Sequence, residues 1–268
     1  MHRRLLPFPL PLPLLFVLLT LCFACARAAE PPAVAAAADL KFALAEAATQ
    51  FERDSGQKVR LSFGSSGNFT QQIENGAPFE LFLSADESFV FRLADAGRTL
   101  DRGTPYAIGR LVLFVPERSP LKPDPTLEDL RAALTDGRLR RFAIANPEHA
   151  PYGRAARSVL RHAGLWTGIE PRLVLGENAA QAMQFAASGS SQGGIVPLSL
   201  SRAPDIARQG RFVPLPAEWH ADEPLRQRMV LLKGAGATAR AFHDWLRSPA
   251  GRDLLARHGF TRPEASAP

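Results

Sequence analysis

The chain has 268 residues, 46% of them hydrophobic, a net charge of +6 at pH 7 and two cysteines. This length suits a globular protein of two lobes with about 100 to 150 residues each. The charge is modest and no basic stripe is interleaved with aromatic residues, so the composition argues against a nucleic-acid partner.

Residues 1–28 have the pattern of a secretory signal peptide. Arg3 and Arg4 precede an apolar run from Leu5 to Phe23, and small residues follow at 26–28. The alternative is a transmembrane anchor, but the prolines in the run and the small-residue exit argue against it. Both cysteines, Cys22 and Cys25, fall inside this segment. We therefore expect an exported, periplasmic protein that has no disulfide.

Predicted strands and helices alternate along the rest of the chain, which is typical of an α/β protein with mostly parallel sheets. The first half contains strands expected at 33–37, 59–63, 79–83 and 111–115. A helix after the first strand places Asp39 at its N-cap, and Asp86 or Ser84 caps the helix after the third. A further helix is expected at 126–134, with Asp129 in a capping box.

The second half continues the alternation. Strands are expected at 142–145, 173–175, 193–197 and 229–232, and helices at 154–163, 180–187, 238–246 and 249–258. Several strand ends lead directly into helix starts, at Asp39, Ser66, Asp86, Tyr152 and Ala179. Because ligands of open α/β sheets bind beyond the carboxyl ends of the strands, these positions are expected to converge on one cleft.

The turn Phe63-Gly64-Ser65-Ser66-Gly67-Asn68 is the strongest local signal for a ligand. Glycines at a junction of strand and helix let backbone N–H groups turn inward, and a serine at the N-cap adds a hydroxyl beside the positive helix end. Such a turn can hold an anion. The alternative is an ordinary helix cap with two turn glycines.

Several segments together resemble the periplasmic molybdate-binding proteins (ModA) of ABC importers, in order along the chain. The segments are 34–40 (VAAAADL), 63–67 (FGSSG), 72–78 (QIENGAP), 83–87 (LSADE), 146–151 (NPEHAP) and 257–260 (RHGF). The resemblance implies a two-lobed periplasmic-binding-protein fold with the ligand cleft between the lobes. One lobe would comprise residues 29–107 plus 217–268, and the other residues 108–216.

The resemblance also implies a function. The protein would capture molybdate or tungstate as a small oxyanion, without a cofactor, and pass it as a monomer to an ABC permease with a separate ATPase subunit. Matching the family's motif residue by residue places Ser66, with Ser65 beside it, and the backbone amides of Tyr152 and Ala179 at the ligand. Ser66 and Ala179 would be the contacts to the molybdate oxyanion itself.

Two positions depart from the family pattern. Asp39 stands where a serine is expected, and Pro197 stands where a tyrosine is expected. Asp39 caps its helix, or repels a bare dianion, or accepts a proton from a protonated oxyanion such as phosphate. The missing tyrosine contact is lost or supplied by Ser199, Ser201 or the side chain of Tyr152.

A secreted serine hydrolase is the hypothesis from another class. Ser65 or Ser66 with His149 and Asp86 could be imagined as a triad, but the turn lacks the Gly-x-Ser-x-Gly elbow of such enzymes. The remaining histidines have no metal-ligand spacing, and the chain has no phosphate-binding loop of a nucleotide hydrolase. We therefore expect no catalytic residue, and a binding protein in place of an enzyme.

Overall fold

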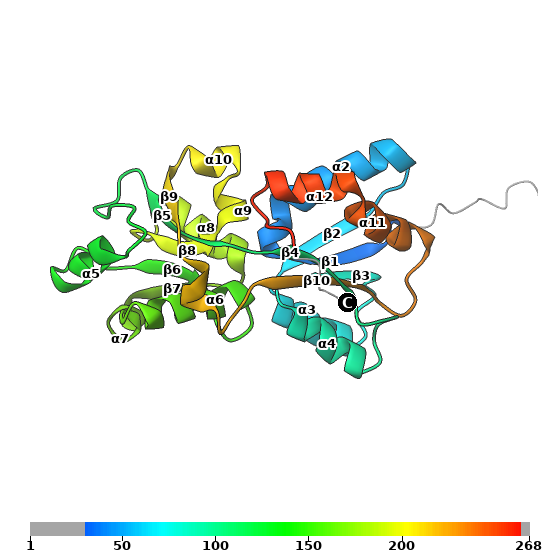
Figure 1. The fold of residues 1–268 in the computed structure, drawn as a ribbon, viewed down its shortest axis with the longest axis horizontal. Helices are drawn as coiled ribbons and strands as arrows, with labels where there is room; N and C mark the ends of the chain where they lie inside the picture. The colour runs from blue at the N-terminus through cyan, green and yellow to red at the C-terminus, as the bar shows by residue number, and fades with distance from the viewer. Residues whose placement is uncertain (1–29, 264–268) are drawn as a thin grey trace, which may run out of the picture. The chain divides into compact units, whose positions relative to one another are not determined.

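The computed structural model describes residues 30–263 and contains two five-stranded sheets (Figure 1). The first sheet has the strand order β2 (Arg60–Gly64), β1 (Ala33–Ala37), β3 (Leu81–Ser84), β10 (Arg226–Leu231), β4 (Thr104–Ile108). The second has the order β7 (Leu173–Gly176), β6 (Phe142–Ala145), β8 (Gly194–Pro197), β5 (Leu111–Pro116), β9 (Gly210–Pro214). The predicted signal peptide lies outside the described residues.

In each sheet three parallel strands form one side, and the next strand runs antiparallel to both of its neighbours. β1 pairs in parallel with β2 and β3, whereas β10 runs antiparallel to β3 and β4. β6 pairs in parallel with β7 and β8, whereas β5 runs antiparallel to β8 and β9. The predicted two-lobed α/β class is confirmed.

Helices cover the sheets on both faces, as the ribbon shows (Figure 1). Those beside the first sheet are η2 (Ala38–Leu40), α2 (Lys41–Ser55), α3 (Ser66–Glu74), α4 (Glu87–Asp95), α11 (Ala237–Arg247) and α12 (Pro249–Arg257). Those beside the second are α5 (Glu128–Thr135), α6 (Pro151–His162), α7 (Trp166–Ile169), η3 (Glu170–Arg172), α8 (Ala179–Ala187), α9 (Leu198–Ser201) and α10 (Pro204–Ala207), and η4 (Ala217–His220) precedes β10. No helix among the described residues is both long enough and apolar enough to cross a membrane.

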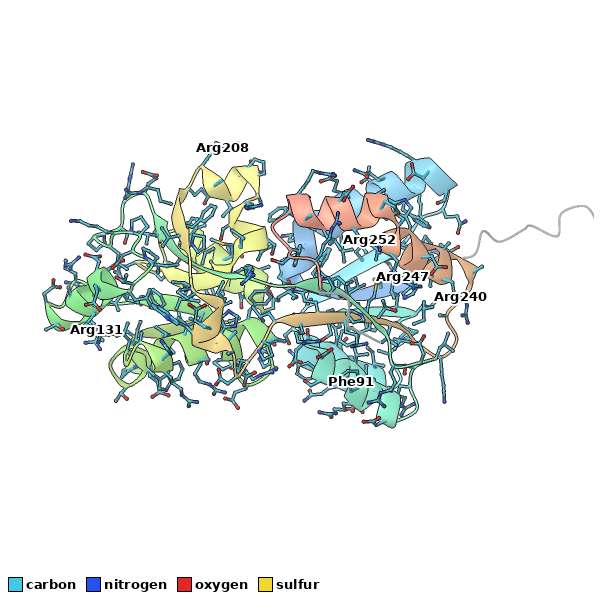
Figure 2. The ribbon with its side chains drawn as sticks, in the orientation of Figure 1. Phe91, Arg131, Arg208, Arg240, Arg247 and Arg252 are labelled. Atoms are coloured by element: carbon cyan, nitrogen blue, oxygen red, sulfur yellow. The ribbon has the colours of Figure 1, made fainter. Side chains whose placement is uncertain are left out.

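The strand period of two divides the core of the first sheet between its faces. Val34 and Ala36 of β1 belong to the cluster under α2, α11 and α12, whereas Ala35 belongs to the cluster under α3 and α4. The guanidinium carbon of Arg228 in β10 lies 4.7 Å from the ring centroid of Phe91 in α4, a residue that Figure 2 labels. Burial on both faces explains why β1 consists only of small apolar residues.

The chain crosses between the two sheets at β4–β5 and returns at β9–β10. Both crossings involve strands that the sequence analysis missed, because β4, β9 and the start of β10 carry Pro105, Arg211 and Arg226 in place of an apolar run. The exact lobe boundaries at 107–108 and 216–217 stay a prediction.

The start of α5 differs from the expected capping box. The N-cap residue is Leu127, with φ 61°, and no side chain caps the helix from that position. The carboxylate of Asp124 accepts hydrogen bonds from the backbone N–H groups of Glu128 and Asp129 at 2.8 and 3.1 Å. The predicted role of Asp129 in a capping box is therefore wrong, because Asp124 satisfies the free amides of the first turn.

Candidate functional site

A small cavity lies where the two sheets meet, and it is lined by residues from both. They are Ala37, Ala38, Asp39, Gly64, Ser65, Ser66, Ala85, Ala150, Pro151, Tyr152 and Ala179. Five of the six predicted ligand-binding residues are in this set, and Pro197 is not. The enclosed volume is about 10 Å³, close to that of one water molecule.

Three helices begin at this cavity. The backbone N–H groups of Ser66 in α3, Tyr152 in α6 and Ala179 in α8 have no hydrogen-bond partner in residues 30–263. The neighbouring amides are already used, since Asn68 donates to Ser65 and Ala180 donates to Asn178. One unpaired donor and the positive end of a dipole therefore remain at each helix start, which is the arrangement that binds anions.

The side chain of Ser66 adds a fourth donor. Ser66 is fully buried, and its hydroxyl oxygen accepts a hydrogen bond from the backbone N–H of Ala85 at 3.0 Å. Because the oxygen is held in this way, the hydroxyl hydrogen is left for another acceptor. Ser66 is therefore placed to donate into the cavity.

Ser65 has a different role, although it is adjacent. It is the N-cap of α3, and its hydroxyl accepts from the N–H of Asn68 at 3.3 Å. The same hydroxyl lies 3.0 Å from Nδ1 of His149 in the loop before α6. Ser65 therefore links the first sheet's helix to the second sheet's loop.

Further contacts hold the two sides of the cavity together. The N–H of Gly67 donates to the carbonyl of His149 at 3.0 Å. Asn68 donates to Glu177, whose carboxylate also lies 3.6 Å from Nε2 of His149. On another side, Arg154 of α6 pairs with Asp86 at the start of α4. The cavity is thus closed by contacts between residues of the two lobes.

Asp39 does not cap a helix, which corrects one predicted alternative. It lies inside η2, and the N-cap positions of η2 and α2 are Ala37 and Leu40, neither with a side-chain cap. Its Oδ2 instead accepts a hydrogen bond of 2.6 Å from Nε2 of Gln227 in β10. The side chain therefore points into the buried interior between the lobes.

Only one of the two carboxylate oxygens of Asp39 accepts a hydrogen bond from another side chain. Its Oδ1 is buried and accepts no hydrogen bond within the described chain, and the residue is 1% exposed. Burial raises the pKa of Asp39 to about 6, although the hydrogen bond from Gln227 lowers it. Removal of the charged form from water is the dominant effect.

A chain of hydrogen bonds surrounds Asp39. Gln227 Nε2 also lies 3.2 Å from the hydroxyl of Tyr152, and its Oε1 accepts from the hydroxyl of Tyr106 at 2.6 Å. Sequence reasoning missed Tyr106, because β4 was not predicted, and Gln227, because it precedes the predicted start of its strand at residue 229. Gln227 is two residues before Met229, so extending the predicted strand toward the N-terminus would have placed both on one face. Both residues are buried in the structure.

The candidates for the missing tyrosine contact are reduced to one. The hydroxyl of Ser199 donates to the carbonyl of Asp39 at 2.8 Å, and that of Ser201 donates to the carbonyl of Pro197 at 2.9 Å. Both hydroxyls are therefore occupied. The Tyr152 side chain lines the cavity and its hydroxyl accepts from Gln227 at 3.2 Å, so Tyr152 is the candidate that remains.

The imagined hydrolase triad is not assembled. Ser65 contacts His149, but Asp86 pairs with Arg154 and caps α4 through Ser88. Among residues 30–263 no three His, Cys, Asp or Glu side chains are grouped to bind a metal ion.

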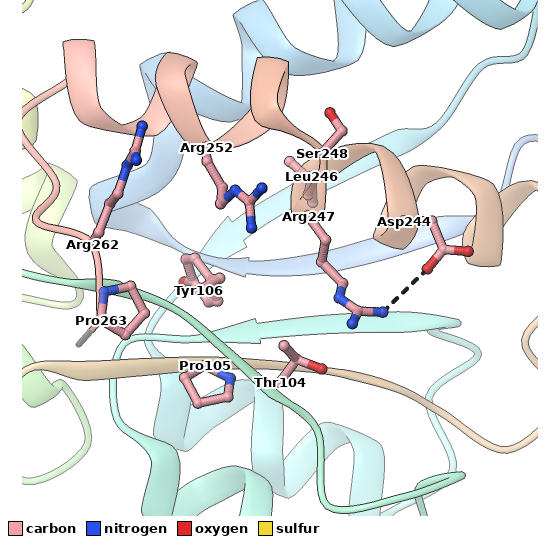
Figure 3. Close-up of a pocket in the computed structure, with 10 residues that line it drawn as sticks. All are labelled: Thr104, Pro105, Tyr106, Asp244, Leu246, Arg247, Ser248, Arg252, Arg262 and Pro263. Carbon is pink, nitrogen blue, oxygen red and sulfur yellow. Dashed lines mark ion pairs between the residues drawn. The ribbon is translucent and has the colours of Figure 1, made fainter. Parts of the chain in front are cut away.

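A larger pocket lies elsewhere, beside α11 and α12. It has a volume of about 840 Å³ and is lined by Arg247, Arg252, Arg262 and Tyr106, among others (Figure 3). It shares no lining residue with the small cavity at the helix starts. Its exposed arginines contrast with that cavity, which has no arginine or lysine in its lining.

A two-lobed fold with a cavity between the lobes, lined by three helix starts, is the architecture of a solute-binding protein. The model of the family described as "Bacterial extracellular solute-binding protein" matches residues 32–261. The chain belongs to this family. The family consists of binding proteins, so the prediction that the chain is not an enzyme is confirmed. The family is also described as extracellular, which places the chain among exported proteins.

Within this family, the chain is similar to proteins that are named as molybdate-binding proteins. The chain is 39% identical over 241 residues to "Molybdate-binding protein ModA" of Azotobacter vinelandii, covering 88% of this chain and 92% of that protein. It is 30% identical to the ModA of Escherichia coli K12, covering 85% and 88%. The solved structure of the Azotobacter vinelandii periplasmic molybdate-binding protein superposes with a TM-score of 0.77 and 32% identity over 87% of this chain and 100% of that one.

The raised pKa of Asp39 predicts a pH-dependent stability. The folded protein holds this proton up to about pH 6, whereas the unfolded chain releases it near 3.8. The contribution of Asp39 to stability is therefore lost as the pH rises from about 4 to 6. We expect Asp39→Asn to raise the free energy of unfolding by about 2 to 3 kcal/mol at pH 7.5 and to change it little at pH 3.5.

Urea denaturation at the two pH values measures this difference. Asp205→Asn, which removes an exposed carboxylate on α10, is the matched control. Equal stability of Asp39→Asn and the unaltered protein at pH 7.5 would show that the Asp39 carboxylate is not destabilised by burial.

Proposed function

We propose that this protein binds molybdate in the cavity between its lobes and delivers it to an ABC importer. The observation that carries the proposal is the convergence of the unpaired N–H groups of Ser66, Tyr152 and Ala179 with the Ser66 hydroxyl. Four neutral donors around one enclosed space suit a tetrahedral oxyanion. The relatives named as molybdate-binding proteins support the choice of ligand.

Neutral donors are physically appropriate for this cargo. Hydrogen bonds to a charged group are worth about 1.5 to 3 kcal/mol each, so a few of them offset the loss of hydration when the lobes close. A cationic side chain would bind more strongly but would also slow release. The donors are fixed by helix starts, so their geometry selects the ligand.

The remaining parts of the proposal follow the predicted sequence features. Residues 1–28 act as a cleaved signal peptide that directs the protein to the periplasm. The lobes, 29–107 plus 217–268 and 108–216, close on the ligand as a monomer. The closed form is recognised by a membrane permease, whose ATPase subunit supplies the energy for transport.

Calorimetric titration tests the ligand. We expect molybdate and tungstate to bind tightly, and sulfate and phosphate to bind weakly or not at all. Ser66→Ala removes a donor from a buried anion and should cost about 1.5 to 3 kcal/mol of molybdate affinity. Ser190→Ala, at an exposed serine outside the cavity, should leave the affinity unchanged. Unchanged affinity in Ser66→Ala would remove this hydroxyl from the site.

Closure of the lobes can be tested at Gly67. A Cβ at this position would lie 2.6 Å from the carbonyl oxygen of His149, which is too close for the two lobes to meet. We expect Gly67→Ala to weaken molybdate binding about tenfold or more, corresponding to 1.4 kcal/mol per factor of ten. Small-angle scattering with molybdate should show a larger radius for this variant than for the unaltered protein.

Gly236→Ala is the control for the closure experiment. This glycine starts α11, and a Cβ there would meet only the flexible side chain of Glu80, at 3.3 Å. Its molybdate affinity and radius should match those of the unaltered protein. Full affinity and compaction in Gly67→Ala would show that contact between Gly67 and His149 is not required for binding.

A further inference from the structure

We infer that molybdate binds together with one proton, which Asp39 carries on Oδ1 and donates to the oxyanion. The inference rests on the proposed function and concerns the same cavity. It predicts a property that the neutral donors alone do not have, namely that ligand affinity depends on pH.

The hydrogen-bond chain determines where a proton on Asp39 must lie. The hydroxyl of Tyr106 donates to Oε1 of Gln227 at 2.6 Å, so the amide nitrogen of Gln227 is turned the other way. The amide nitrogen, which can only donate, therefore faces Oδ2 of Asp39 at 2.6 Å and the hydroxyl of Tyr152 at 3.2 Å. Since Oδ2 accepts from Gln227, the proton belongs on Oδ1.

Oδ1 is the one oxygen of the pair that lacks a partner. It is buried, it accepts no hydrogen bond in residues 30–263, and Asp39 lines the cavity. A buried acceptor without a donor is costly when it is charged. As a hydroxyl, the same atom becomes a donor that needs an acceptor, and a bound oxyanion supplies one.

No charged group neutralises the Asp39 carboxylate. The side chains that face it from the neighbouring elements are neutral: Tyr106 of β4, Tyr152 of α6, Gln227 of β10 and Ser199 of α9. Burial raises the pKa of Tyr106 and Tyr152 well above the usual value, so both remain protonated. His149 contacts Ser65 in the cavity lining, and Lys41, two residues after Asp39, is exposed.

Electrostatic interaction couples the binding of molybdate to the binding of a proton by Asp39. An ionised Asp39 would repel a dianion, whereas a protonated one offers a charge-assisted hydrogen bond. Burial already raises the pKa of Asp39 to about 6, and an anion beside it raises the pKa further. Above that pH the free protein must therefore take one proton from solvent when molybdate binds, and it returns that proton when molybdate leaves.

Calorimetry in buffers of different ionisation enthalpy, such as Tris and PIPES, counts the protons taken up. At pH 7.5 we expect close to one proton per molybdate, and a Kd that rises about tenfold per pH unit from pH 6.5 to 8.5. For Asp39→Asn we expect binding without proton uptake and a Kd independent of pH. Asp39→Ser should behave in the same way, and thermal melting confirms that both variants fold.

Two controls assign the proton to Asp39. Asp205→Asn, which removes an exposed carboxylate on α10, should keep the uptake and the pH dependence of the unaltered protein. His162→Gln, which replaces an exposed histidine at the end of α6, should also keep the uptake. Loss of the uptake in His162→Gln, or its persistence in Asp39→Asn, would overturn the inference.

The outcomes separate this inference from the proposed function. Tight molybdate binding with no proton uptake at pH 7.5 would overturn the inference and leave the function intact. Absence of molybdate binding at every pH would overturn the function and the inference with it. Binding of phosphate without proton uptake, but not of molybdate, would show that the ligand brings its own proton to an ionised Asp39.

Discussion

The buried hydrogen-bond chain from Tyr106 through Gln227 to Asp39 and Tyr152 is the interaction on which the site depends. It joins two strands of the first sheet, the η2 turn and the first turn of α6. The hydroxyl of Tyr106 donates to Oε1 of Gln227, and the amide nitrogen of Gln227 donates to Asp39 and Tyr152. A partly satisfied network in a buried region is costly, so the single unpaired oxygen, Oδ1 of Asp39, stands out as the point at which a ligand would complete the network.

The amide groups at the three helix starts allow a dianion to be both bound and released. A small dianion must lose its hydration on entry and regain it on release, so the protein needs many moderate interactions and no permanent counter-ion. The unpaired amides of Ser66, Tyr152 and Ala179 provide these interactions from rigid elements. Asp39 adds a negative group to this neutral set, and its protonation keeps the set neutral when the anion is present.

The contacts that close the lobes are made by residues next to the binding donors. Gly67 lets the start of α3 approach the carbonyl of His149, and Ser65 and Asn68 on the same turn reach His149 and Glu177. The residues that close the cavity are thus the immediate neighbours of Ser66, which faces the ligand. A movement of either lobe changes the positions of the donor groups around the cavity, because the closing contacts and the Ser66 donors share one helix turn.

The sequence by itself determined the α/β class, the glycine- and serine-rich turn and the strand ends that supply Ser66, Tyr152 and Ala179. These features are local, since the periodicity of two or 3.6 residues and the chemistry of a helix start are legible along a single segment. Only the tertiary structure decided the role of Asp39, which was expected at an N-cap. Its partners Gln227 and Tyr106 lie 188 and 67 positions away, on strands with polar residues. Burial, pairing and the resulting pKa arise from elements brought together by folding, and no local pattern encodes them.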